Sequence, residues 1–243
     1  MLKISKAYIE RSVEQIIAPK GAGMVRFFDC PLNCIFCGSD RSPGNAVAFS
    51  ESGFINVLKL FSEQRLSIAV VTCLSQDIEV FSKAVGAARA VGVTLPLFYL
   101  SNGFESEELI AAAPKLFDGV IFDFLFGSDE LGEELAGVKG YFKTASAALK
   151  EFASAFGSNT VKDGVIERGL LIRHTVLPGY PESSKAVIDF LAKPKFKKYP
   201  LSLGIDYRPK GAAESHPLLS RSARKTDVMP ISRYAILKGL HAV

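Results

Sequence analysis

Six short apolar segments, each followed by an amphipathic segment, limit most strongly how this chain can fold. The apolar segments are rich in β-branched and aromatic residues and end at residues that favour turns. The predicted strands are residues 24–28, 67–72, 95–100, 119–125, 169–177 and 201–207. Regular alternation of strands and helices indicates a parallel sheet, because each parallel connection must cross over that sheet.

The amphipathic segments predict the helices that make these crossovers. They cover residues 53–64, 76–91, 106–115, 130–156 with a break near 137–140, 182–192 and 231–238. Six such units fit either an incomplete (β/α)6 barrel or an open doubly wound sheet. In both folds, ligands bind beyond the carboxyl ends of the strands. Those ends carry Cys30, Thr72, Cys73, Ser101, Asn102, Asp123, His174, Asp206 and Tyr207.

The composition is that of a globular protein with a sizeable core. Of the 243 residues, 48% are hydrophobic and 22% are charged, which excludes a disordered chain. The net charge of +4 is a small basic excess, so we expect no nucleic-acid partner. No apolar run reaches the roughly 18 residues of a membrane span, so we expect a cytoplasmic protein. We expect one domain over 1–243, with a core at about 22–210 and an extension over 211–243.

Three of the four cysteines lie within eight residues, as Cys30-Pro-Leu-Asn-Cys34-Ile-Phe-Cys37. Clustered cysteines in a cytosolic chain more often hold a metal than form a disulfide. Iron–sulfur clusters normally have four cysteine ligands, so a loop with three leaves one iron of a [4Fe-4S] cluster open. Two alternatives remain at this point: a zinc site completed by Cys73 or a histidine, and a purely structural or redox cluster.

The C-x3-C-x2-C loop, directly after the first strand of a six-unit α/β chain, resembles the radical SAM superfamily. The aromatic Phe36 before the last cysteine fits this resemblance. It implies an incomplete (β/α)6 barrel in which Cys30, Cys34 and Cys37 bind a [4Fe-4S] cluster. It also implies that S-adenosylmethionine (SAM) chelates the open iron and is cleaved to a 5′-deoxyadenosyl radical. By this resemblance Phe36 lies near the adenine, and a flavodoxin- or ferredoxin-like protein donates the electron.

Further segments look like the pyruvate formate-lyase-activating enzyme group and its uncharacterised relatives. They are residues 100–104, 123–124, 173, 176–179 and 207–209, so the resemblance spans about 22–210. It implies hydrogen abstraction from a glycine of a partner protein. Radical modification of a peptide or a small metabolite is the alternative within this class. A zinc- or cluster-bearing binding protein without catalysis is the alternative outside it.

The sequence departs from the family pattern at three places. A Gly-Gly-Glu type motif normally follows the second strand, whereas residues 71–75 read Val-Thr-Cys-Leu-Ser. Contacts to the methionine part of SAM are therefore expected from the backbone or from Thr72 and Ser75. Leu100 replaces an acidic residue, and no lysine follows Asp123.

The remaining polar strand ends each allow a functional and a structural interpretation. Ser101 and Asn102 either bind SAM or form an ordinary Asn-Gly turn. Asp123 either contacts the ribose or forms an ion pair or helix cap. Arg173 is expected to meet the SAM carboxylate, so His174 points to the opposite face as a satisfied histidine. Cys73 is either a buried apolar residue or a reactive thiol.

Overall fold

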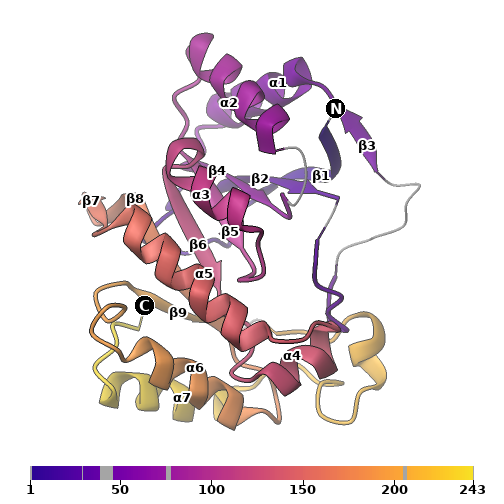
Figure 1. Cartoon of the computed structure of the whole chain (residues 1–243), viewed down its shortest axis with the longest axis vertical. Coiled ribbons are helices and arrows are strands. Elements are labelled where there is room, and N and C mark those ends of the chain that lie inside the picture. The colour runs from indigo at the N-terminus through magenta and orange to yellow at the C-terminus, as the bar shows by residue number, and fades with distance from the viewer. Residues whose placement is uncertain (1, 29, 39–45, 75–77, 205–206, 243) are drawn as a thin grey trace.

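The computed structural model describes residues 2–28, 30–38, 46–74, 78–204 and 207–242, and Figure 1 shows it as a cartoon. Its centre is a curved sheet in the order β3-β1-β2-β4-β5-β6-β8-β7, with β9 paired to β8. The strands are β1 Leu2–Glu10, β2 Ala22–Phe27, β3 Val47–Phe49, β4 Ile68–Thr72, β5 Leu97–Ser101, β6 Gly119–Asp123, β7 Thr160–Lys162, β8 Val165–Thr175 and β9 Leu201–Gly204.

Six of these strands form the parallel barrel wall that the sequence predicted. They are β2, β4, β5, β6, β8 and β9, each parallel to its neighbour in that order. The other neighbour of β2 is the antiparallel β1, so the sheet does not close on itself. The predicted incomplete (β/α)6 barrel is therefore confirmed, and the open doubly wound sheet is not what forms.

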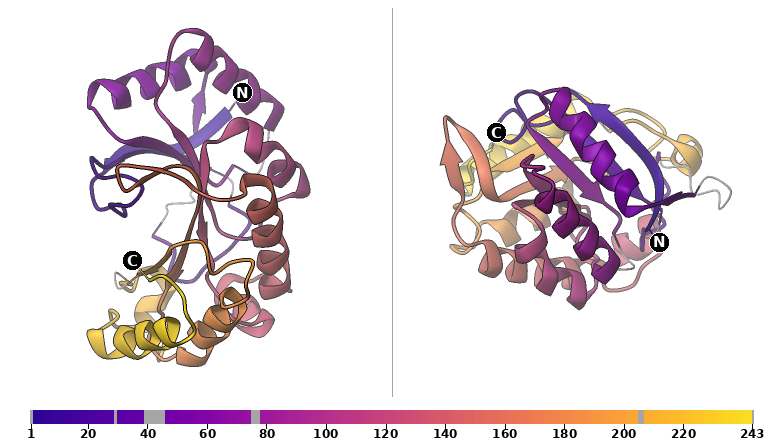
Figure 2. Two further views of the ribbon diagram at one scale, coloured as in Figure 1. Left: turned by 90° about the vertical axis from the view of Figure 1, so that its left-hand side faces the viewer. Right: turned by 90° about the horizontal axis from the view of Figure 1, so that it is seen from above.

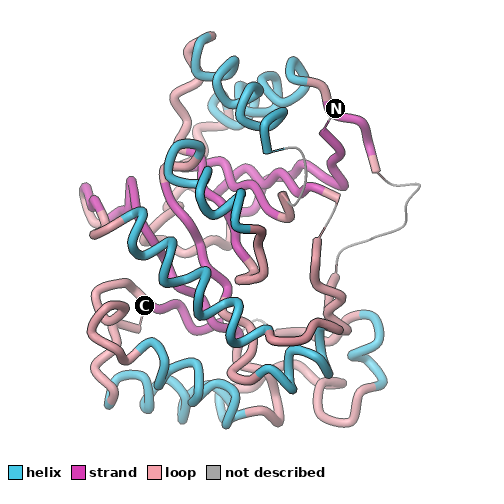
Figure 3. Tube along the Cα trace, in the orientation of Figure 1, coloured by secondary structure: helices cyan, strands magenta, loops and turns pink. Residues whose placement is uncertain are grey.

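The helices form an arc around the outer side of the sheet (Figures 2 and 3). Serine side chains cap three of them: Ser50, Ser106 and Ser128 each accept a hydrogen bond from the backbone N–H three residues on. The predicted break falls at Gly137, whose left-handed backbone ends α4. The helices are α1 Glu51–Glu63, α2 Ile78–Ala90, α3 Glu107–Leu116, α4 Asp129–Ala136, α5 Tyr141–Phe156, α6 Pro181–Leu191 and α7 Lys225–Leu237.

The two faces of the sheet bury different clusters. Outward-facing residues such as Val71 and Phe122 pack under the helices. Inward-facing residues such as Val70 and Ile121 pack with Ile17, from the segment between β1 and β2, in a smaller apolar cluster. This cluster packs residues of β2, β4, β5, β6 and β8 against that segment. Polar side chains that face inward are thus gathered towards the carboxyl ends of the strands.

Three strands were missed by the sequence analysis. In β1 a register irregularity between Ile4 and Lys6 breaks the alternation that marks a strand. The hairpin of β7 and β8 turns on Asp163-Gly164, both with positive φ. Strand β3 has only three residues.

The carboxyl-terminal part of the chain also differs from the prediction. Helix α7 begins at Lys225, six residues earlier than predicted, and contains Pro230. The sixth strand was predicted to end at Tyr207, whereas β9 ends at Gly204. The strand-end candidate Asp206 and the predicted start of the second helix, at Gln76, lie outside the described residues. In the described part of the chain, none of the helices combines the length and apolarity that a bilayer crossing requires.

Candidate functional site

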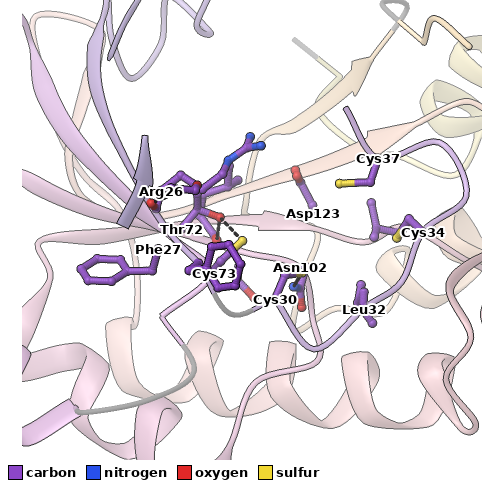
Figure 4. A pocket seen from close by; sticks show the side chains of 15 residues that line it. Arg26, Phe27, Cys30, Leu32, Cys34, Cys37, Thr72, Cys73, Asn102 and Asp123 are labelled. Atoms are coloured by element: carbon purple, nitrogen blue, oxygen red, sulfur yellow. Dashed lines mark hydrogen bonds between the residues drawn. The ribbon is translucent and has the colours of Figure 1, made fainter. Parts of the chain in front are cut away.

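Cys30, Cys34 and Cys37 line one pocket at the carboxyl end of the barrel strands (Figure 4). Their loop follows β2, as the sequence predicted. The pocket wall also contains Thr72 and Cys73 at the end of β4, Ser101 and Asn102 at the end of β5, and Asp123 at the end of β6. The fold therefore brings the cysteine loop and most of the predicted polar strand ends into one place.

The cysteine loop is held by backbone hydrogen bonds to two other elements. The last carbonyl groups of a helix have no partner within the helix. Here Asn33 N–H donates to Ala136 O of α4 at 2.8 Å, and Ile35 N–H donates to Leu135 O at 2.9 Å. On its other side, Ile35 O accepts from Ala213 N–H, in the 3-10 helix Gly211–Ser215, at 3.1 Å. The loop thus has a defined path around the pocket.

Phe36 packs away from the lining of this pocket. Its ring makes edge contacts with Phe126, with ring centroids 6.1 Å apart, and with Tyr207, at 5.9 Å. These contacts anchor the loop between the last two cysteines. The expected contact of Phe36 with adenine stays a prediction.

The three thiols of the loop have the donor chemistry of a metal ligand set. A zinc ion binds its ligands at about 2.0–2.3 Å. A four-iron cluster takes each thiolate on a different iron, so its ligands surround a larger volume. Among the described residues, no group of three or more histidine, cysteine, aspartate or glutamate side chains is arranged as a site for a metal ion. Three thiols spaced around one pocket have the donor chemistry for a four-iron cluster.

Asn102 and Ser101 have different roles in the structure, although they are adjacent. Asn102 Nδ2 donates to Cys30 Sγ at 3.4 Å. The Ser101 side chain is fully buried, and its hydroxyl donates to Glu105 Oε2 at 2.8 Å. Ser101 is the last residue of β5, whereas Asn102 is the first residue after it, and both line the pocket. The proposed contact of either residue with SAM stays a prediction.

The end of β4 replaces the expected Gly-Gly-Glu with side chains that make internal contacts. Thr72 Oγ1 donates to Leu100 O at 3.1 Å, which joins β4 to β5. Cys73 has a φ of +59°, a conformation that side chains other than glycine rarely adopt. Its thiol forms a hydrogen bond with Cys30, and this bond together with burial raises the pKa of Cys73 well above its ordinary value. Cys73 therefore stays protonated at neutral pH, and Ser75 lies outside the described residues.

Asp123 and Arg173 form a two-bond ion pair across β6 and β8. Arg173 Nε lies 2.6 Å from Asp123 Oδ1, and Nη2 lies 2.8 Å from Oδ2. Arg173 Nη1 also lies 3.7 Å from Glu14 Oε1, which accepts from Ser202 Oγ at 3.0 Å. The ion pair anticipated for Asp123 is thus present. Contacts of Asp123 with a ribose and of Arg173 with a carboxylate remain predictions.

His174 points away from the barrel interior, as predicted from strand alternation. Its ring is buried, with Nδ1 at 2.6 Å from Phe124 O and Nε2 at 2.8 Å from Ser184 Oγ. Burial lowers the pKa of His174, so the ring is neutral in the folded chain. Its role is structural.

Glu105 is a polar residue of the site that the sequence analysis missed. Its carboxylate accepts from Ser101 Oγ, from Asn102 N–H at 2.9 Å and from Tyr99 OH at 3.4 Å. Burial raises the pKa of Glu105 from 4.5 to about 7, although the hydrogen bonds that it accepts act in the opposite direction. The sequence did carry a signal for this residue. Glu105 is an acidic residue shortly after the Asn102-Gly103 turn and directly before the helix cap Ser106.

Comparison with solved structures identifies the fold. SuiB from Streptococcus suis superposes with a TM-score of 0.61 at 12% identity, over 90% of this chain and 48% of SuiB. The enzyme anSMEcpe with bound AdoMet superposes with a TM-score of 0.55 at 13% identity, over 88% of this chain and 61% of anSMEcpe. The chain has the partial barrel fold of the radical SAM enzymes.

These radical SAM structures include ligand complexes. SuiB was solved bound to S-adenosylmethionine and bound to its precursor peptide SuiA. A further anSMEcpe structure contains AdoMet and the Cp18Cys peptide. The chain spans less than two thirds of the length of either protein.

Sequence comparisons add little to this identification. No family model matches the sequence. An uncharacterized protein of Methanocaldococcus jannaschii is 20% identical over 227 residues, which cover 89% of this chain and 62% of that protein.

Proposed function

We propose that this chain is a radical SAM enzyme whose [4Fe-4S] cluster is held by Cys30, Cys34 and Cys37. One observation carries the proposal. The three thiols of a C-x3-C-x2-C loop line a single pocket, and that pocket lies at the carboxyl end of a partial barrel with the radical SAM fold. Ligands of parallel α/β folds bind at this end of the strands.

The chemistry that the bound cluster and SAM supply is one-electron cleavage of a C–S bond, which gives methionine and a 5′-deoxyadenosyl radical that abstracts hydrogen from the substrate. The chain contributes three thiolates and leaves the fourth iron to SAM. Asn102 contacts the first cysteine, and the backbone contacts of Asn33 and Ile35 keep the loop in place.

Polar groups around the pocket are proposed to bind SAM. Asp123 lines the pocket and keeps acceptor capacity for a ribose hydroxyl while paired with Arg173. Arg173 lies behind Asp123 and is not among the residues that line the pocket. It uses two of its five N–H donors on Asp123, and Nη1 faces Glu14 at 3.7 Å, so its proposed contact with the SAM carboxylate uses the remaining donors. Thr72, at the end of β4, lies at the position of the usual Gly-Gly-Glu motif and lines the pocket. Ser101 and Asn102 line the same pocket and belong to the proposed set. The apolar Phe36, which does not line this pocket, is proposed to lie near the adenine by resemblance to the family.

The substrate is proposed to be a peptide or a protein. The barrel wall is open along one side, which gives access for a large substrate. Peptides are bound in the SuiB and anSMEcpe structures that share this fold. Activation of a glycyl-radical protein is one form of this proposal, with hydrogen taken from a glycine of the partner. A flavodoxin- or ferredoxin-like protein is the proposed electron donor.

One observation favours a second candidate, a metal-bearing binding protein without catalysis. Cys73 occupies the place of the Gly-Gly-Glu motif, and its thiol contacts Cys30. With Cys73 as a fourth thiol beside the loop, all metal positions could be taken by protein ligands, as in a closed structural site. No iron would then be left open to SAM.

Anaerobic reconstitution separates the two candidates. We would measure iron and sulfide per chain and the electron paramagnetic resonance (EPR) spectrum of the reduced protein, for wild type, Cys34→Ala and Cys73→Ala. The enzyme proposal expects about four irons in wild type and in Cys73→Ala, loss of the cluster in Cys34→Ala, and a changed EPR spectrum when SAM is added. Loss of the cluster in Cys73→Ala, or a spectrum that SAM leaves unchanged, would support the closed site.

A further inference from the structure

Asn102 connects the end of β5 to the first cysteine of the loop. Its side-chain amide donates to Cys30 Sγ at 3.4 Å, within the range of a hydrogen bond to sulfur, and Figure 4 shows the two side chains next to each other. A donor aimed at a cysteine sulfur acts on whatever that sulfur binds. This contact therefore reaches the cluster that the proposed function assigns to Cys30.

The direction of the Asn102 amide is fixed by a second bond. Its Oδ1 accepts from Phe104 N–H at 2.9 Å. The carbonyl end is thus committed to a backbone donor, so the N–H₂ end faces Cys30. A flip of the amide would put N–H₂ against another N–H and oxygen against sulfur. The hydrogen-bond network therefore selects the donating orientation.

Glu105 holds the backbone of Asn102 in place through hydrogen bonds. Its Oε1 accepts from Asn102 N–H at 2.9 Å and its Oε2 accepts from Ser101 Oγ at 2.8 Å. On the other side, Asn102 O accepts from Tyr141 OH at 2.8 Å. The loop between them contains Gly103 at a φ of +84°, where an added Cβ would lie 2.8 Å from Ala145 Cβ. The turn thus has little freedom to move.

We propose that Asn102 raises the reduction potential of a cluster bound by Cys30, and that Glu105 is the positioning residue that aims its amide. The inference rests on the proposed function for the presence of that cluster. A hydrogen bond to a cysteine sulfur stabilises the added negative charge of the reduced cluster, and such bonds are one of the means by which proteins set cluster potentials. No hydrogen bond described in the structure joins Glu105 to a cysteine, so the positioning effect of Glu105 acts through its hydrogen bond to Asn102 N–H.

The test is an EPR-monitored redox titration of the reconstituted full chain. The variants are Asn102→Leu, which keeps the shape but removes the donor, Asn102→Asp, which replaces it with an acceptor, and Glu105→Gln. Asn56→Leu and Glu107→Gln, at exposed positions on helices α1 and α3, are the matched controls.

For Asn102→Leu we expect the ratio of reduced to oxidised cluster, measured at the wild-type midpoint, to fall about tenfold. That equals a shift of about 59 mV to more negative potential for one electron. Asn102→Asp is expected to shift further in the same direction, and the controls are expected to match wild type. Glu105→Gln is expected to shift less than Asn102→Leu. In the Asn102→Leu background, Glu105→Gln is expected to give no further shift to more negative potential.

Several results would overturn the inference. An Asn102→Leu chain with full iron content and the wild-type potential refutes the role of Asn102. If Asn102→Leu holds no cluster, the Asn102→Asp chain is used instead. A reduction potential of Asn102→Asp equal to that of wild type then refutes the role of Asn102. Additive shifts in the double variant refute positioning by Glu105. A wild type that binds no cluster refutes this inference and the proposed function together, whereas a cluster that does not cleave SAM refutes only the proposed function.

Discussion

Replacing Arg173 with methionine tests whether its pairing with Asp123 supports the site. Methionine keeps most of the length of the side chain but removes all five donors. Asp123 would then face the pocket without its two-bond partner, and Glu14 would lose a cation 3.7 Å away. The carboxylates of Asp123 and Glu14 would then lie in the barrel without a cation. In the described structure, Glu14 would keep the hydrogen bond that it accepts from Ser202 Oγ. The barrel interior should therefore become less stable.

The expected loss follows from the burial of the pair. Breaking a buried ion pair costs about 3–5 kcal/mol, because one charge remains buried without its partner. The side chains of Arg173 and Asp123 are 31% and 21% exposed, so water screens part of this cost. We expect Arg173→Met to lower the unfolding free energy by about 2 kcal/mol. For a chain of this length, that is a fall of about 4–8 °C in melting temperature.

The assay is thermal and urea unfolding of the cluster-free chain, followed by circular dichroism. It compares wild type, Arg173→Met, Asp123→Asn and the double variant. The double variant should be more stable than the sum of the single effects by about 2 kcal/mol, because residue 123 then carries no unpaired charge, while Glu14 lacks its cation in the double variant and in Arg173→Met alike. Additive losses, or an Arg173→Met chain as stable as wild type, would refute the assigned pairing.

Three further predictions concern stability and are checked by urea unfolding. The raised pKa of Glu105 means that the folded chain holds a proton that the unfolded chain releases. The unfolding free energy should therefore fall by at most about 3 kcal/mol as pH rises from 4.5 to about 7. Glu105→Gln should remove this dependence on pH. The lowered pKa of His174 has the opposite effect, so the unfolding free energy should fall as pH drops below 6.5. His174→Ala should remove this dependence on pH. It should also lower the unfolding free energy by about 2–3 kcal/mol, because two buried hydrogen bonds are lost. Gly119→Ala would place a Cβ 2.1 Å from the Phe98 ring and should cost about 2 kcal/mol. The control Gly86→Ala, in α2 with nothing within 4 Å of the added atom, should be neutral or stabilising. Equal effects at the two glycines, or pH slopes that survive the substitutions, would contradict these assignments.

The barrel was predictable because its strands are covered on both faces. Parallel strands in that setting become almost continuous apolar runs, and the six runs of this chain correspond to β2, β4, β5, β6, β8 and β9. Strand β1 was not predicted because an irregularity after Ile4 interrupts its alternation and because much of it is exposed. The β7–β8 hairpin did carry a signal, since Asp163-Gly164 is a common two-residue turn between strands.

The site was predictable in its cysteines and less so around them. The spacing of Cys30, Cys34 and Cys37 on one short loop brings them to one pocket wherever the loop lies. The different contacts of Ser101 and Asn102 could not have been anticipated from alternation, because Asn102 lies beyond the end of β5. The contacts of Asn102 with Cys30 could not have been anticipated. They depend on where a loop after β5 meets a loop after β2, which is a property of the folded chain.

The measurement that tests the central proposal most directly is cleavage of SAM by the anaerobically reconstituted chain with dithionite. Wild type, Cys34→Ala and the control Cys73→Ala would be compared by the amount of 5′-deoxyadenosine formed per chain. We expect 5′-deoxyadenosine from wild type and none from Cys34→Ala, with Cys73→Ala retaining the cluster and some activity. A wild-type chain that holds four irons, binds SAM and is reduced by dithionite, but forms no 5′-deoxyadenosine in the presence of candidate peptides, would contradict the proposal.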